Sequence, residues 1–282
     1  MNDATITGTS IPELEDGAQR IRALVLESVA HAGAGHIGGP LSAADILSAL
    51  YFRILQIRPE EPEWPERDRF ILSKGHSTIA LYAAMALRGF FPIEELKTFD
   101  ALDSRLQGHP DMTVLPGLDM SSGSLGLGFS AGVGMALGAK ATGRDFTTFV
   151  LLGDGECNEG IVWEGAHAAS RYGLDNLIAV VDHNKLQQYG WRGESPDVRT
   201  SPYERDDLAT RWAAFGWEVR EIDGHDMTSI VDALESARTV GGSPVAIVAH
   251  TVKGRGVSFM EGDYLWHAKV PDPENLATAL AA

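Results

Sequence analysis

The fold is decided by residues 147–185, which read TTFVLLGDGECNEGIVWEGAHAASRYGLDNLIAVVDHNK. The β-branched and apolar run 147–152 predicts a strand, and the Gly-Asp-Gly turn at 153–155 ends that strand abruptly. Apolar residues then recur at helical spacing across 161–172 until a glycine stops the helix, and 177–181 is a second short apolar run. The stretch therefore predicts one strand–helix–strand unit of about 30 residues.

Two oxygen-bearing side chains follow the two strands of this unit. A right-handed crossover makes the strands parallel, so Asp154 and Asn184 are expected past their carboxyl ends, where open α/β sheets bind ligands. A carboxylate, an amide oxygen and nearby backbone carbonyls suit Mg²⁺ or Ca²⁺ rather than zinc. Because Mg²⁺ keeps places for phosphate oxygens, we expect a diphosphate over the turn Gly153–Gly155, where glycines let the backbone approach closely. The alternative is an Asp-Gly turn followed by an unrelated Asn cap.

Strand and helix signals alternate on both sides of this unit. They predict an α/β fold with a mostly parallel sheet and helices on both faces, built as one domain over 17–282 behind a flexible polar segment, 1–16. The stretch 189–207 is expected to be irregular. Further strands are expected at 68–72, 217–222 and 245–250, and further helices over 77–87 and 131–140 and after Pro273.

Composition restricts the class of protein. The net charge of −16 argues against nucleic-acid and anionic membrane partners. Cys157 is the only cysteine, so no internal disulfide can form, and the first residues show neither a basic region nor an apolar run of a signal peptide. No run of about twenty apolar residues is present. We therefore expect a cytoplasmic protein without a membrane span.

Three histidines follow glycines in loops ahead of the Gly-Asp-Gly turn. They are His36, after which Ser42 is expected to cap a helix, His76 at the end of a strand, and His109 in a turn-rich stretch. Coincidence among nine histidines is the alternative. The glycine-rich loop 123–126 is a further place where backbone can meet a ligand. His31, His167, His183, His225 and His250 are interpreted as structural. Lys253 and Arg255 follow a strand and could face phosphate, but solvated surface is the commoner explanation for each, so neither is placed in the predicted site.

Seven segments of the sequence, in this order, resemble the diphosphate-binding domain of transketolase over about 20–271. They read GAGHIGGPLS, DRFILSKGH, QGHPD, SSGSLGLG, LLGDGECNEG, VVDHNK and KGRGVSF with WHAKVP. The Gly-Asp-Gly…Asn pattern on its own is similar to the motif of all thiamine diphosphate enzymes. The three Gly-His loops restrict the resemblance to transketolases and their near relatives.

The resemblance implies thiamine diphosphate as cofactor and a set of site residues. Mg²⁺, which Ca²⁺ or Mn²⁺ can replace, would be held by Asp154, Asn184 and the carbonyl of Leu186. Glu159 would join an acidic network that links paired sites across a subunit interface, although it can simply favour a helix N-terminus. The catalytic residues implied are His36, His76, His109 and His267; those implied for cofactor binding are His76, Gly123, Ser124, Leu125, Gly153, Asp154, Gly155, Glu159, Asn184 and His267.

The sequence also departs from the family pattern. Ser124 stands where the family usually has proline, and the segment Tyr264–His267 has one histidine where many relatives have two. The sequence ends after this domain, without the pyrimidine-binding and C-terminal domains of a complete transketolase. We therefore expect the N-terminal subunit of a split transketolase, which forms an α2β2 assembly with a separately encoded C-terminal subunit and moves a two-carbon ketol unit between sugar phosphates. A deoxyxylulose-phosphate-synthase-like or other thiamine enzyme subunit, and a non-catalytic regulatory module, are the alternatives.

Overall fold

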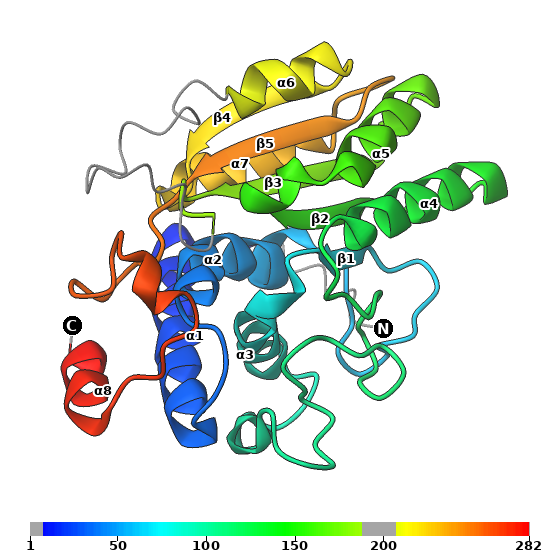
Figure 1. Ribbon diagram of the computed structural model, residues 1–282. Coiled ribbons are helices and arrows are strands. Elements are labelled where there is room, and N and C mark those ends of the chain that lie inside the picture. The colour runs from blue at the N-terminus through cyan, green and yellow to red at the C-terminus, as the bar shows by residue number, and fades with distance from the viewer. Residues whose placement is uncertain (1–7, 188–206, 282) are drawn as a thin grey trace.

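Five parallel strands form the centre of the molecule (Figure 1). The computed structural model describes residues 8–187 and 207–281. The strand order across the sheet is β1-β2-β3-β5-β4, and every neighbouring pair is parallel. The predicted parallel sheet is thus confirmed. The strands are β1 (Arg69–Leu72), β2 (Thr148–Gly153), β3 (Leu177–His183), β4 (Glu218–Asp223) and β5 (Val245–His250).

Helices cover both faces of the sheet, as predicted. Alternate residues of β2 point to opposite faces: Val150 and Leu152 pack with α4, α5 and α6, whereas Phe149 and Leu151 belong to the larger core with α1, α2, α3 and α7. The helices are α1 (Ile11–Ala32), α2 (Gly38–Ala49), α3 (Thr78–Arg88), α4 (Leu127–Thr142), α5 (Gly160–Arg171), α6 (Leu208–Ala214), α7 (Met227–Ala237) and α8 (Pro273–Leu280). Short helical segments are η1 (Leu50–Ile54), η2 (Gly75–Ser77), η3 (Ile93–Thr98), η4 (Gly155–Asn158) and η7 (Tyr264–His267).

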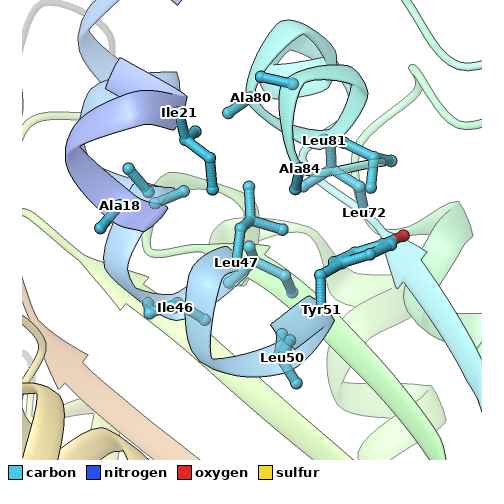
Figure 2. Close-up of a cluster of buried hydrophobic side chains, with 14 of the residues drawn as sticks. Ala18, Ile21, Ile46, Leu47, Leu50, Tyr51, Leu72, Ala80, Leu81 and Ala84 are labelled. Carbon is cyan, nitrogen blue, oxygen red and sulfur yellow. The ribbon is translucent and has the colours of Figure 1, made fainter. Parts of the chain in front are cut away.

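The larger core joins three helices to the first strand. Figure 2 shows Ile21 of α1, Leu47 of α2 and Leu81 of α3 directed toward one space, beside Leu72 of β1. These side chains are at most 2% exposed. Burial of a leucine or isoleucine side chain stabilises the fold by roughly 1.5–3 kcal/mol. This packing holds the loops at the ends of α2 and β1, which carry two of the predicted histidines.

Three helices begin earlier than the sequence pattern predicted, one of them α4, which begins at Leu127 where a helix was expected over 131–140. Helix α1 begins at Ile11, inside the segment 1–16 that was expected to be flexible, because Pro12 suits the first turn and Glu13 accepts hydrogen bonds from the backbone N–H and the hydroxyl of Ser10. Residues 11–16 are therefore helical rather than part of a flexible segment. Helix α2 begins at Gly38, so Ser42 lies inside the helix and is not its cap.

The predicted strand–helix–strand unit is present as β2, η4, α5 and β3. The two strands pair in parallel from Thr148 with Leu177 to Gly153 with Asp182. Helix α4 packs closely on this sheet, where a Cβ at Gly132 would meet Val150 at 2.5 Å. The stretch 189–207, predicted to be irregular, lies almost wholly outside the described residues, as does 1–7. Within the described ranges, no helix is both long and apolar enough to cross a membrane.

Candidate active site

A cavity of about 490 Å³ opens at the carboxyl ends of the strands, and it brings together most of the predicted site residues. Segments after β1, β2 and β3 meet there with the loops before α2 and α4 and with the C-terminal tail. Ser124 and Glu159 are exposed and do not line the cavity. The predicted residues that line it are His36, His76, His109, Gly123, Leu125, Gly153, Asp154, Gly155, Asn184, Leu186 and His267.

Four histidines form a cluster on one side of the cavity. The ring centroid of His36 lies 5.0 Å from those of His76 and His267 and 6.4 Å from that of His109. Burial, with Lys74 as the next cause, lowers the pKa of His76 to about 2. Burial and Lys253 likewise lower the pKa of His267 to about 3. These two rings are therefore neutral at physiological pH, and each offers one donor and one acceptor nitrogen.

The predicted metal ligands lie together, directly after the carboxyl ends of β2 and β3. Asp154 is 4% exposed, and its carboxylate accepts hydrogen bonds from the backbone N–H groups of Gly155 (2.7 Å) and Lys185 (2.6 Å). Lys185 has a positive φ of 63°. The Asn184 amide oxygen accepts from the N–H of Leu186 at 3.1 Å. Burial and the neighbouring Asp182 raise the pKa of Asp154 to about 6. A cation beside this buried carboxylate would stabilise its charged form.

This set of donors suits a hard metal ion that also binds phosphate. Among the described residues, no group of three or more His, Cys, Asp or Glu side chains is arranged to hold a metal. Asp154, Asn184 and the Leu186 carbonyl supply oxygens only, so further ligands would have to come from water or a bound anion. Mg²⁺ prefers such a partial shell. The structure is thus compatible with Mg²⁺ and a diphosphate, and it disfavours a zinc site.

Lys253 belongs to the cavity, which corrects the sequence-based interpretation of this residue as solvated surface. It is 3% exposed, donates to the Leu186 carbonyl at 3.0 Å and lies 2.8 Å from His267 Nδ1. Burial, followed by the charge of Lys74, lowers the pKa of Lys253 to about 8. Arg255 is a surface residue as expected, because its half-exposed side chain faces Glu261. The signal for Lys253 was its position in a glycine-rich loop just after a strand.

Two further charged groups of the site have no signal in the local sequence. Lys74, after β1, forms a buried ion pair with Asp182 of β3, and the hydroxyls of Ser42 and Thr251 donate to the same carboxylate. Glu156 is 2% exposed and accepts from the Ser73 hydroxyl and from the N–H groups of Gly126 (2.7 Å) and Gly153 (3.1 Å). These contacts tie the strand ends to the loop before α4. No local sequence pattern signals pairs so far apart in the chain.

The loop 123–126 approaches the cavity as predicted. Gly126 has a positive φ of 82°, and a Cβ there would meet Ile161 at 2.5 Å. A Cβ at Gly75 would lie 2.8 Å from the backbone carbon of Ser122, so the loop after β1 and this loop touch. Glycine is required at both places. The backbone of Gly123 and Leu125 is thereby held at the cavity wall.

Comparison with known proteins shows the family of the chain. Residues 15–277 match the family described as "Transketolase, thiamine diphosphate binding domain". The chain is 47% identical over 255 residues to the 6-deoxy-6-sulfo-D-fructose transketolase subunit SqwG of Clostridium sp. (strain MSTE9), covering 90% of each chain. It is 42% identical to one subunit of the apulose-4-phosphate transketolase of Phocaeicola vulgatus, covering 96% of this chain and 93% of that one.

Longer transketolases share the same domain. The solved transketolase of Campylobacter jejuni superposes with a TM-score of 0.86 at 34% identity, covering 94% of this chain and 42% of that one. The chain thus spans about two fifths of the solved transketolase and nearly the whole length of the two subunits. The chain belongs to the transketolase family, in which it corresponds to the thiamine diphosphate binding domain.

Proposed function

We propose that this chain is the cofactor-binding subunit of a two-subunit transketolase, which moves a two-carbon ketol unit from a ketose to an aldose with thiamine diphosphate and Mg²⁺. The observation that carries the proposal is the cavity, which joins neutral histidines to a buried oxygen-ligand set and a buried lysine. Relatives of nearly the same length, named as transketolase subunits, support the division into two chains.

Named residues of the cavity fit the cofactor. Asp154, Asn184 and the Leu186 carbonyl would hold Mg²⁺, and the Lys253 ammonium and the turn Gly153–Gly155 would hold the diphosphate. The backbone of Gly123 and Leu125 would line the aminopyrimidine. When bound, thiamine diphosphate supplies the electron sink that stabilises the carbanion formed beside a carbonyl. The protein then has to supply position and protons.

The histidine cluster can supply both. The Lys253 ammonium can only donate hydrogen bonds, so Nδ1 of His267 is the acceptor. The neutral His267 ring therefore carries its proton on Nε2 and can donate a hydrogen bond from there to a sugar oxygen. His36, His76 and His109 line the same side of the cavity and can bind neighbouring hydroxyls. Each neutral imidazole can donate a hydrogen bond from one ring nitrogen and accept one at the other, so the cluster can bind and orient the hydroxyl and carbonyl oxygens of a sugar.

The remaining contacts are proposed for a partner chain. Ser124 and Glu159 are exposed, so a second chain can reach them, and Glu159 would join the acidic network between paired sites. We propose an α2β2 assembly in which the partner supplies the pyrimidine-binding domain and most contacts to the terminal anion of the sugar. The substrates named for the relatives, 6-deoxy-6-sulfo-D-fructose and apulose 4-phosphate, are the first donors to test.

The test is reconstitution of ketol transfer. The chain is co-purified with its C-terminal partner and assayed with thiamine diphosphate, Mg²⁺, an aldose phosphate acceptor and a panel of ketose donors, with the separate subunits as controls. We expect transfer only in the mixture and only with both cofactors. A stable complex that binds the cofactor but transfers a ketol unit from no donor would contradict the proposed function. Consumption of pyruvate in place of a ketose would indicate a synthase-like reaction instead.

A further inference from the structure

A buried polar network lies behind the loop 251–256, which carries Lys253. Arg22 of α1 contacts Asp45 of α2, and the Asp45 carboxylate lies 2.7 Å from Nδ1 of His225, which stands in the turn after β4. The three side chains are 6%, 10% and 8% exposed. None of these three residues lines the cavity.

The hydrogen bonds fix the protonation of the His225 ring. The backbone N–H of Val252 donates to Nε2 at 2.8 Å, so Nε2 is unprotonated. The ring proton is therefore on Nδ1 and faces Asp45. Although burial opposes ionisation, the bonds from His225 and Arg22 keep the pKa of Asp45 below its usual range. The charged carboxylate in turn orients the imidazole, as carboxylate partners of histidine commonly do.

The segment around Val252 is held from two sides. The Thr251 hydroxyl donates to Asp182, whose carboxylate also pairs with Lys74 of the cavity, and the next N–H along the chain donates to His225. Gly224 lets the turn after β4 come close, because a Cβ there would meet Thr251 at 2.4 Å. Lys253 follows directly, and its ammonium reaches Leu186 and His267. The position of His225 thus sets where the Lys253 side chain begins.

We propose that His225 is a positioning residue for cofactor binding: held by Asp45 and Arg22, it fixes the backbone at Val252 and so directs the Lys253 ammonium toward the diphosphate. The identity of the ligand rests on the proposed function. The sequence suggested a purely structural role for His225. The role proposed here differs, because it depends on one atom, the Nε2 nitrogen that accepts the Val252 N–H. Its disruption should weaken ligand binding more than it weakens the fold.

Two substitutions distinguish the contribution of Nδ1 of the His225 ring from that of Nε2. His225→Gln places an amide oxygen near Nε2, so it can still accept from Val252, whereas His225→Asn reaches only the position of Nδ1 and leaves the Val252 N–H without an acceptor. Binding of thiamine diphosphate with Mg²⁺ to the two-subunit complex is measured by calorimetry. Backbone hydrogen exchange in 251–256 is measured in parallel. His167→Gln, an exposed histidine on α5, is the control.

We expect His225→Asn to weaken cofactor affinity about tenfold and to speed exchange at Val252, while His225→Gln stays within about threefold of the unsubstituted complex. If the Asn variant does not fold, His225→Leu replaces it as the variant without an acceptor. Equal affinities for the Gln variant and the variant without an acceptor would overturn the proposal, because a purely structural role does not rank them. Failure of the unsubstituted complex to bind thiamine diphosphate would count against the proposed function instead.

Discussion

At the scale of single residues, Lys253 is the strongest test of how the cavity holds an anion. Replacing its ammonium by the thioether of Lys253→Met removes a buried charge that faces Leu186 and His267. We expect affinity for thiamine diphosphate to fall about thirtyfold, on the order of 2 kcal/mol, in a calorimetric titration. Arg255→Met, in the same loop but at the surface, is the matched control and should leave affinity unchanged. Equal losses for both variants would remove Lys253 from the site.

Asn184 tests the metal assignment. Asn184→Ala removes one oxygen ligand while the strand before it remains buried, so we expect weaker binding of Mg²⁺ and of the cofactor without unfolding. The loss should be about tenfold in a titration of the complex with Mg²⁺ at fixed thiamine diphosphate. Asn275→Ala on the surface helix α8 controls for the substitution itself. A normal titration of Asn184→Ala would show that this amide does not bind the metal.

His76 should make the fold sensitive to acid. Burial lowers its pKa to about 2 in the folded chain, below the ordinary value of 6.5, so the unfolded chain binds the extra proton as the pH falls. The stability that the neutral His76 ring contributes to the fold is fully present above about pH 6.5. It is lost as the pH falls below 6.5, by about 2 kcal/mol at pH 5. Urea unfolding at about pH 7 and pH 5 should show a smaller loss in His76→Asn than in the unsubstituted chain. The exposed His167→Asn should lose as much as the unsubstituted chain, and an identical loss in all three would contradict the assignment.

Residues that act through distant partners are the ones that sequence cannot identify. The Gly-Asp-Gly turn and Asn184 follow strands that could be read directly, so their meeting at one sheet edge was predictable. Lys74 and Asp182 lie 108 residues apart in the chain, and their charges give no local sign of pairing. The sequence-based interpretation of Lys253 is wrong because most lysines in loops are solvated, whereas burial of this one depends on the packing of the C-terminal tail.

At the scale of elements, helix α4 shows how small residues set the distance between helix and sheet. Gly132 faces Val150 with no room for a Cβ, whereas a Cβ at Gly134 would meet nothing within 4 Å. We expect Gly132→Ala to destabilise the chain by about 1–3 kcal/mol and Gly134→Ala to stabilise it by about 1 kcal/mol, measured by urea unfolding. The two variants control each other, since both add one methyl to the same helix. Effects of the same sign would contradict the packing described for α4.

The existence and order of most elements were predictable, and their ends were less so. All five strands were expected from the sequence. Four of them are short runs that are buried along most of their length, as is usual in a parallel sheet, whereas the edge strand β4 is largely polar and not buried. Residues 11–16 are helical although they were expected to be flexible, because Leu14 packs in the core and the first turn of α1 is stabilised by Pro12 and Glu13. Serine is usual at a helix cap, which is why Ser42 suggested one, but its hydroxyl donates to Gly39 and Asp182 within the fold.

At the scale of the whole molecule, the family and the α/β architecture were predicted correctly from the order of the motifs. Periodicity could not show that β5 lies between β3 and β4, because that order depends on long-range packing of α6 and α7. The position of β5 matters for function, since it places Lys253 beside the ends of β2 and β3. The cavity is therefore a product of topology as much as of local motifs.

A crystal structure of the two-subunit complex, grown with thiamine diphosphate and Mn²⁺, tests the proposed site most directly, because Mn²⁺ scatters anomalously and can replace Mg²⁺. We predict one anomalous peak bound by Asp154, Asn184 and the Leu186 carbonyl, with the diphosphate beside Lys253 and the thiazolium facing His36, His76 and His267. A metal or cofactor bound elsewhere, with this cavity left to solvent, would contradict the assignment of the cavity as the cofactor site.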